Sequence, residues 1–316
     1  MQLYNSLNTP PLMRQCALTI GTFDGVHRGH QELIKVLQRE AKARNLPVTV
    51  LTFHDMPYYY FNTESCPRLL TLKHEKNEVF QSLLIDHLFN VPFDAAIAEQ
   101  PAEFFVRDIL VRRLGLELLV VGPDFALGKG RHGNVPRLQA LGQELGFDVV
   151  VLEQKVMDGD EPVSSTRIRE AVESGDVSAA MRMLGRPFSF TGKVVSGKQL
   201  GRTIGVPTIN LQLHPRKVIP AHGIYAARAW WGEDKKPHDK KPHRAALSIG
   251  SNPTVNGSGL NIEFHVIGED IETPPETAYL EIIARLRDEQ KFADLPTLVA
   301  QMQRDIARAD EILAAY

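Results

Sequence analysis

The sequence has 316 residues, 43% of them hydrophobic, with 36 Lys and Arg against 38 Asp and Glu. This ordinary composition excludes wholesale disorder and a collagen-like chain, and the length corresponds to about two domains of ~150 residues. The net charge of -2 argues against a general polyanion binder held by phosphate contacts. We therefore expect no nucleic-acid partner, whereas a small phosphorylated ligand needs only a few well-placed donors.

The cysteine content and the hydropathy pattern point to a soluble cytoplasmic protein. Cys16 and Cys66 are the only cysteines, too few for a disulfide framework or a Cys-based zinc site. No apolar run approaches the ~20 residues that a membrane span needs, and residues 1–15 lack the continuous apolar stretch of a secretory signal. We expect no membrane partner, and the sequence leaves the oligomeric state open.

The first part of the chain alternates between strand-like and helix-like segments. Short apolar runs predict buried strands, and apolar residues at helical spacing predict helices between them. Strands separated by helices imply βαβ units and a parallel, Rossmann-like α/β sheet. The predicted strands cover residues 17–20, 47–53, 116–121 and 147–153, and the predicted helices cover residues 30–44, 103–114, 137–145 and 165–174.

The pattern changes after residue 186, where we place the boundary between a domain at 1–186 and a second at 187–316. Short segments rich in β-branched residues recur there between turn signals, which is typical of an antiparallel sandwich or barrel. Residues 297–315 then predict an amphipathic C-terminal helix. The predicted strands lie within residues 188–197, 206–213, 223–231, 244–250, 260–268 and 278–286.

Residues 234–243 repeat DKKPH twice in tandem. The two histidines of the repeat could bind a metal, but the Lys and Pro content favours a solvated hairpin tip.

The segment GTFDGVHRGH at 21–30 lies between a predicted strand and a predicted helix. Gly21, Gly25 and Gly29 permit tight turns and a close approach of a ligand to the backbone. His27 and His30 can share one face of the first helical turn, beside the free N–H groups that make a helix start an anion site. The segment therefore suits the binding of a triphosphate. A glycine-rich turn with two surface histidines and no ligand would have the same sequence pattern.

A second hydroxyl-rich helix start, SSTRIR, covers Ser164, Ser165, Thr166 and Arg167 within residues 164–169. Hydroxyls at a helix start can cap the helix or bind phosphate oxygens, and an arginine can contact phosphate in a bidentate way. A plain N-cap with solvated arginines is the simpler interpretation of this segment alone. We predict that this segment and the histidine segment both lie at the carboxyl ends of parallel strands. Open α/β sheets bind ligands at that position.

The later domain contains GKQLGRTIGVPTIN at 197–210. Gly197, Gly201 and Gly205 are spaced for a flexible loop over phosphates, and Thr208 and Asn210 lie on one side of the following strand. A hydroxyl and an amide oxygen are suitable hard ligands for Mg²⁺ bound to ATP. An edge strand after a glycine-rich hairpin remains the alternative.

Three segments of the first domain resemble the FAD synthetase module of the bacterial bifunctional riboflavin kinase/FMN adenylyltransferases, members of the HxGH nucleotidyltransferases: GTFDGVHRGH, VGPDFALGKGRHGN and SSTRIREAVESGDV. The second domain is similar to their riboflavin kinase module in LGRPF, GRTIGVPTIN, GIYAARA, SIGSNPT, IEFHV and RLRDEQKF, in the family's order. The resemblance spans roughly residues 16–310. It implies phosphorylation of riboflavin to FMN and adenylylation of FMN to FAD, each with ATP and Mg²⁺, by a Rossmann-like domain and an antiparallel β-barrel.

The resemblance also implies roles for individual residues. It implies catalytic roles for His27, His30, Arg167 and Glu263, the last as the base of the kinase. It implies flavin contacts for Asp124, Phe125 and Arg285, and metal contacts for Thr208 and Asn210. It implies ATP or phosphate contacts for Gly21, Phe23, Asp24, Gly29, Ser164, Ser165, Thr166, Gly201, Gly205, Thr208 and Asn210.

Two rival interpretations stay open at this point. One is a nucleotidyltransferase with another acceptor, such as a pantetheine or nicotinamide nucleotide, and the other is a non-catalytic sensor built on decayed modules. The chain departs from the family pattern at Met56, where a histidine is usual, and also at Leu127, Asn134, Ser248 and Asn252.

Overall fold

The computed structural model describes residues 1–8, 14–61, 66–196, 201, 204–231, 241–252 and 259–316. The described chain forms two compact units, Met1–Ser165 and Thr166–Tyr316. Helix α8 (Val177–Leu184) falls in the second unit, because it packs against strands of that unit. Helix α7 (Ser165–Ser174) also belongs to the second unit, except for its first residue. The boundary at residue 186 remains a prediction of where one functional module ends and the next begins.

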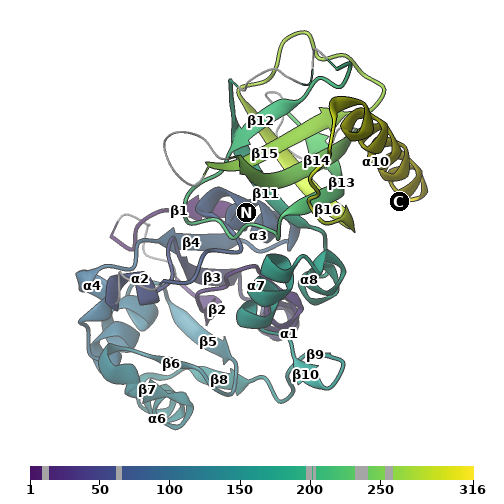
Figure 1. Cartoon of the computed structure of the whole chain (residues 1–316). Helices are drawn as coiled ribbons and strands as arrows, with labels where there is room; N and C mark the ends of the chain where they lie inside the picture. Colours follow the sequence, from purple (N-terminus) through teal and green to yellow (C-terminus); the bar gives the residue numbers. More distant parts are fainter. Residues whose placement is uncertain (9–13, 62–65, 197–200, 202–203, 232–240, 253–258) are drawn as a thin grey trace. The chain divides into compact units, whose positions relative to one another are not determined.

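The first unit is built on a six-stranded, fully parallel sheet with the order β1-β4-β3-β2-β5-β8 (Figure 1). The central strand β2 is the point at which the order reverses, since the chain runs from it to β3 on one side and later to β5 on the other. The strands are β1 (Gln2–Tyr4), β2 (Cys16–Ile20), β3 (Val48–Phe53), β4 (His87–Val91), β5 (Leu116–Val121) and β8 (Asp148–Val151).

Side chains alternate along the strands, so the hydrophobic core of this unit forms two layers, one on each face of the sheet. Ala17 of β2 and Val50 of β3 face a cluster that includes α1 (Arg28–Arg44) and Phe80 of α3 (Lys73–Ser82). Leu18 and Leu51 face the opposite cluster, built with η1 (Phe105–Val111) and α6 (Val135–Leu145). Helices therefore cover both faces of the sheet, as a parallel sheet requires.

Shorter elements complete the first unit. They are α2 (Tyr58–Phe61), α4 (Ala95–Ala98), α5 (Ala102–Phe104), β6 (Ala126–Leu127), η2 (Lys129–Arg131), β7 (Gly133–Asn134), β9 (Met157–Asp158) and β10 (Glu161–Pro162).

The predicted elements of this unit are present, and the main differences concern α1, the helix at 103–114 and elements that were not predicted. Helix α1 begins at Arg28, two residues before the predicted start, because His27 occupies the N-cap position. The predicted helix at 103–114 is a short α5 followed by the π-helix η1. The sequence analysis did not predict β1, α3 or β4, because their apolar runs are short.

The second unit is a closed antiparallel barrel in the order β11-β12-β15-β14-β13-β16, with β16 pairing back to β11 (Figure 1). Closure makes it a barrel rather than a sandwich. Helix α10 (Leu295–Ala315) packs its Ala309 and Leu313 against Ala226 and Ile283 of the barrel. The strands are β11 (Phe188–Val195), β12 (Ile209–Gln212), β13 (Gly223–Trp230), β14 (His243–Asn252), β15 (Gly259–Val266) and β16 (Thr277–Arg287).

Most of the tandem DKKPH repeat lies outside the described residues, so the predicted hairpin tip stays a prediction. Among the residues described, no helix is both long and apolar enough to cross a membrane.

Candidate active sites

The turn after β2 has a backbone conformation that residues other than glycine rarely adopt. Phe23, Gly25 and Val26 have φ angles of 49°, 82° and 41°. Glycine adopts such angles freely, but a phenylalanine and a valine do so only when surrounding structure holds them there. The turn follows the strand at which the sheet order reverses, and open α/β sheets bind ligands at this position.

The buried carboxylate of Asp24 fixes the backbone of this turn through hydrogen bonds. The Asp24 side chain is only 2% exposed. The carboxylate accepts backbone hydrogen bonds from Leu70 at 3.0 Å and Thr71 at 3.1 Å, and the Gly25 N–H donates to Thr71 Oγ1 at 3.0 Å. Asp24, expected to contact ATP, thus anchors the turn to the segment before α3.

His27 and His30 stack on each other at the start of α1, with ring centroids 3.6 Å apart and planes 19° apart. The edge of Phe23 meets the ring of His30 at 5.1 Å. Two glycines leave room for these rings. A Cβ on Gly29 would lie 3.2 Å from the His27 ring, and one on Gly21 would lie 3.1 Å from the Phe23 ring. The structure therefore brings together the two predicted histidines, Gly21, Phe23 and Gly29.

The hydroxyl-rich segment contributes to the same turn through Ser165, whose Oγ donates to the backbone carbonyl of Asp24 at 2.8 Å. Ser164 and Ser165 are half-buried in the first unit. Thr166 and Arg167 follow in the part of α7 that belongs to the second unit, where Thr166 is exposed and Arg167 is half-buried.

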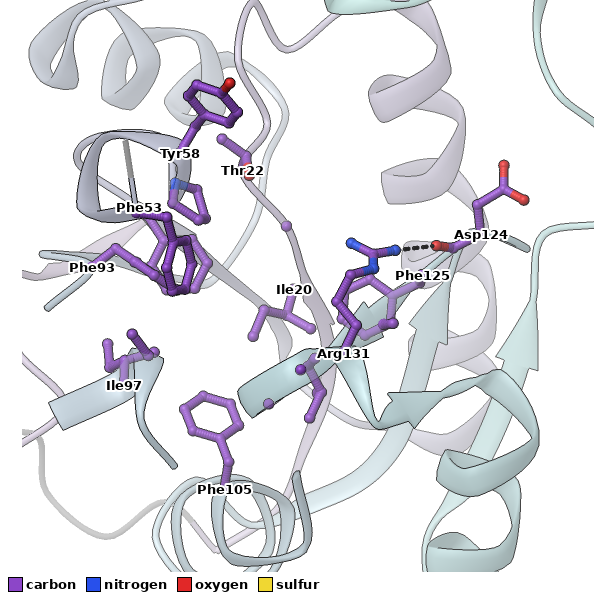
Figure 2. Close-up of a pocket in the computed structure, with 18 residues that line it drawn as sticks. Ile20, Thr22, Phe53, Tyr58, Phe93, Ile97, Phe105, Asp124, Phe125 and Arg131 are labelled. Carbon is purple, nitrogen blue, oxygen red and sulfur yellow. Dashed lines mark hydrogen bonds between the residues drawn. The ribbon is translucent and has the colours of Figure 1, made fainter. Parts of the chain in front are cut away.

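A cavity of about 640 Å³ opens beside the turn and is lined largely by aromatic and aliphatic side chains (Figure 2). Gly21 and Thr22 of the turn belong to its wall. This size and apolar character are typical of sites for small molecules and cofactors. The aromatic residues of the wall are Phe53, Tyr58, Phe61, Phe93, Phe105 and Phe125.

Of the two predicted flavin residues in this unit, Phe125 faces the cavity, whereas the Asp124 carboxylate points away from it (Figure 2). That carboxylate is 79% exposed and pairs with Lys155 at 2.6 Å, while the Asp124 carbonyl accepts from Arg131 at 3.1 Å. The other aromatic wall residues were not predicted. The aromatic density between residues 53 and 61 could have indicated Phe53, Tyr58 and Phe61, whereas no such local signal marks Phe93 and Phe105.

Met56 occupies the position at which the family usually has a histidine, and His54 lies two residues before it. His54 is half-buried after β3, and burial lowers its pKa from the ordinary value. Met56 is buried in a small apolar cluster with Leu69 and Leu72. An apolar side chain suits that cluster, which explains why a methionine is accommodated.

Asn134 and Ser248 mark two further departures. Asn134 caps α6 by accepting a hydrogen bond from the Arg137 N–H at 3.1 Å. Ser248 lines the cavity of the barrel.

In the barrel, Glu263 is the centre of a polar cluster. Its carboxylate accepts from Thr208 Oγ1 at 3.1 Å and from Asn261 Nδ2 at 2.6 Å. Asn210 is the ladder partner of Glu263 between β12 and β15, so both side chains leave the same face of the sheet. The pairing therefore brings Glu263 to Thr208 and Asn210, which lie more than fifty residues earlier in the sequence.

Thr208 and Glu263 line a cavity of about 240 Å³ between the barrel and α10. The backbone before Thr208 is held by His265, whose Nδ1 donates to the Pro207 carbonyl at 2.8 Å. A Cβ on Gly201 would lie 2.2 Å from the Val206 carbonyl oxygen, and Gly205 has a φ of 76°. Two of the three predicted loop positions therefore require glycine, and the third, Gly197, lies outside the described residues.

Arg287, rather than the predicted Arg285, lines this cavity. Arg285 instead donates to the His222 carbonyl at 2.8 Å and pairs with Asp288 at 2.9 Å. A β-bulge between these two residues of β16 shifts the register, and no periodicity in the sequence signals it. Arg287 itself forms a bidentate ion pair with Asp305 of α10, with its closest N–O distance at 2.6 Å.

The donor set in the barrel fits a hard divalent cation that arrives with a nucleotide. Within the part of the chain that is described, no three His, Cys, Asp or Glu side chains gather as a self-sufficient metal site. Thr208, Asn210 and Glu263 instead offer a hydroxyl, an amide and a carboxylate oxygen. Mg²⁺ is commonly bound through one or two such oxygens together with substrate phosphates.

The first unit has a parallel sheet, with the histidine turn after the strand at which the sheet order reverses. The second unit has a barrel in which Thr208 and Glu263 line a small cavity. These features define a two-domain transferase that acts on phosphate groups. Family models match both parts, FAD synthetase at residues 9–167 and riboflavin kinase at residues 184–313. The chain belongs to the bifunctional riboflavin kinase/FMN adenylyltransferase family, and its activities are the phosphorylation of riboflavin to FMN and the adenylylation of FMN to FAD.

Relatives match along nearly the whole chain. The bifunctional riboflavin kinase/FMN adenylyltransferase of Escherichia coli (strain K12) is 40% identical over 299 residues, which are 94% of this chain and 92% of the relative. That of Haemophilus influenzae is 34% identical over 310 residues, or 98% of each chain. A crystal structure titled macrolide-efflux protein from Streptococcus pneumoniae aligns with a TM-score of 0.84 at 27% identity, over 96% of both chains. It shares the fold.

Proposed function

We propose that the barrel carries the riboflavin kinase step and the parallel sheet carries the FMN adenylyltransferase step, with the domain boundary near residue 186. The observation that carries the proposal is the separation of two polar clusters, each beside its own cavity in its own compact unit. The substrates are riboflavin, FMN and ATP, with FAD as the final product. We further propose that the enzyme works in the cytoplasm, where these soluble substrates are found.

In the kinase step, Glu263 is the general base. Its hydrogen bonds with Thr208 and Asn261 fix the orientation of the carboxylate, so that it can accept the proton of the terminal ribityl hydroxyl. Gly201 and Gly205 allow the loop to approach the phosphates of ATP closely. When bound with ATP between Thr208 and Asn210, Mg²⁺ would neutralise phosphate charge.

In the adenylylation step, an oxygen of the FMN phosphate attacks the α-phosphate of ATP directly, the bond to the β-phosphate breaks and pyrophosphate leaves, so no protein nucleophile is needed. His27 and His30, beside the N–H groups at the start of α1, donate hydrogen bonds to charge that develops on the α-phosphate. Ser164, Ser165, Thr166 and Arg167 form a second phosphate-binding segment. The protein accelerates this step by position and charge stabilisation.

The aromatic cavity beside the turn supports the binding of the flavin ring of FMN. Six aromatic residues line it, and Thr22 connects its wall to the histidine turn. Phe125 is the predicted flavin residue that faces the ring. In the barrel, Arg287 takes the role expected for Arg285, because it is the arginine that lines the kinase cavity.

The assignment is tested by a crossed pair of variants, with FMN and FAD resolved chromatographically over time. Glu263→Gln keeps the shape of the side chain and removes the base, so riboflavin phosphorylation should fall by roughly 10²–10⁴-fold while fed FMN still becomes FAD. The double variant H27A/H30A should convert riboflavin to FMN and make no FAD. Loss of both activities in either folded variant would contradict the division of labour.

A further inference from the structure

Lys76 is a buried lysine beneath the histidine turn. It lies on α3 and is 1% exposed, a position that charged side chains almost never occupy without compensation. Its ammonium donates to the backbone carbonyls of Thr22 and Phe53, both at 2.8 Å. A fully buried cation with two backbone partners is a costly feature that packing alone does not require.

The two carbonyls lie at or just after the ends of two neighbouring strands, β3 and β2. Phe53 ends β3, and Thr22 leads from β2 into the turn that carries His27. Both residues also line the aromatic cavity. The Lys76 ammonium thus cross-links, at one point, the start of the histidine turn and the wall of the proposed flavin site.

The turn needs such support, because Phe23 and Val26 are held at positive φ. One side is held by Asp24 through the Leu70 and Thr71 N–H groups, and the other by Lys76 through the Thr22 carbonyl. The charges also compensate each other, since Asp24 and Asp55 both attract the Lys76 ammonium.

We propose that Lys76 is a positioning residue for adenylylation, whose ammonium holds the Phe23–His27 turn in its strained conformation so that His27 and His30 meet the reacting phosphates. The inference rests on the proposed function of the first unit. It assigns Lys76 no contact with substrate. The effect on the reaction passes through Thr22 and the turn.

The proposal carries a pH signature. Burial lowers the pKa of Lys76 to about 8, against the opposing attraction of Asp24 after β2 and Asp55 after β3. His54 after β3 also faces this charge, because the positive charges of Lys73 and Lys76 on α3 contribute, after burial, to the lowering of its pKa. As the pH rises through about 8, the ammonium loses its charge, and Asp24 and Asp55 lose their compensation. Adenylylation should then decline, whereas an arginine at this position stays charged.

The experiment compares Lys76→Met with Lys217→Met in the full chain. Lys217 is a matched control, because it is also fully buried but lies in the second unit. A misplacement of about 1 Å can lower a rate 10²-fold, so K76M should lower kcat for FMN adenylylation about 100-fold. The loss should appear in kcat more than in KM for FMN. Riboflavin phosphorylation by the same molecule should stay within twofold of the parent, and K217M should retain adenylylation.

Two further variants separate positioning from folding. Lys76→Arg should restore part of kcat and remove the alkaline decline above about pH 8. Thr71→Val, which keeps shape but removes the hydroxyl that contacts Gly25, should lower kcat about tenfold by loosening the other side of the turn. The T71V variant still tests the proposal if the larger side chain of K76R prevents that variant from folding.

Three results would overturn the inference: kcat of K76M within threefold of the parent, an equal fall of both activities in K76M, or the same alkaline decline in K76R and the parent. Failure of the proposed function would look different, because H27A/H30A would then keep FMN adenylylation or lose riboflavin phosphorylation as well, whatever K76M does.

Discussion

Gly29 and Gly201 show how single residues determine the two candidate sites. At Gly29 the absent side chain leaves space for the ring of His27, which stacks on His30 one turn of helix away. At Gly201 the space is taken by the Val206 carbonyl oxygen. Neither glycine is needed for a turn of unusual φ. Each is needed because another group approaches the backbone closely.

We predict that Gly29→Ala lowers FMN adenylylation about tenfold and leaves riboflavin phosphorylation unchanged. The new Cβ would lie 3.2 Å from the His27 ring, which must then move by a few tenths of an ångström, and small misplacements of positioned groups lower rates by orders of magnitude. Gly122→Ala is the matched control, because a Cβ there meets no atom within 4 Å. Steady-state kinetics with FMN measures both, and equal rates in the two variants would contradict the prediction.

At the scale of elements, helix α10 completes the kinase cavity that the barrel begins. The cavity is lined from one side by barrel residues such as Thr208 and Glu263, and from the other by residues of α10 such as Met302 and Asp305. Asp305 holds the helix in place through Arg287 at the end of β16, with further support from Gln301. This ion pair is nearly buried, with side chains 16% and 9% exposed.

We predict that Asp305→Ala destabilises the barrel by about 3 kcal/mol, because it leaves the Arg287 charge without its partner in a nearly buried position. The KM for riboflavin should rise as well. Trp230 and Trp231 are the only tryptophans of the chain and lie in the second unit, so denaturation followed by tryptophan fluorescence reports on the barrel.

Glu311→Ala is the control for this change on the same helix. Its ion pair with Arg308 is exposed, with side chains 66% and 67% accessible, and exposed pairs contribute about 0–1 kcal/mol. If D305A and E311A lowered stability equally, the buried pair would have no special role.

At the scale of the whole molecule, two chemically independent sites share one chain and one intermediate, FMN. In the proposed division of labour, the adenylylation site uses His27 and His30, and the kinase site uses Glu263. A variant that disables one step should therefore retain the other, and free FMN is the only link that this proposal requires between the two steps.

We predict that an equimolar mixture of Glu263→Gln and H27A/H30A converts riboflavin to FAD, although neither variant does so alone. The double variant supplies FMN, and E263Q adenylylates it after diffusion. The rate should rise with enzyme concentration, since FMN must pass between molecules. A mixture that accumulates FMN without FAD, from variants that pass their separate assays, would exclude this exchange.

The amino-acid sequence by itself determined where most strands and helices lie. The apolar runs at 116–121 and 223–231 predict buried strands because a local pattern of apolar residues reports burial directly. The two motifs at 21–30 and 201–210 were also readable, since their glycines and polar groups are adjacent in the chain. The parallel α/β class of the first domain and the antiparallel β class of the second followed from the same local patterns.

Only the tertiary structure decided which distant residues meet. Closure of β16 on β11 made the second domain a barrel, and pairing of β12 with β15 brought Thr208 to Glu263. A bulge in β16 shifts the register between Arg285 and Arg287, and Arg287 lines the cavity. Lys76 gave no local signal, because on α3 it is one charged residue among several. Partners, registers and buried charges depend on long-range packing, and periodicity along one segment carries no information about the segment that packs against it.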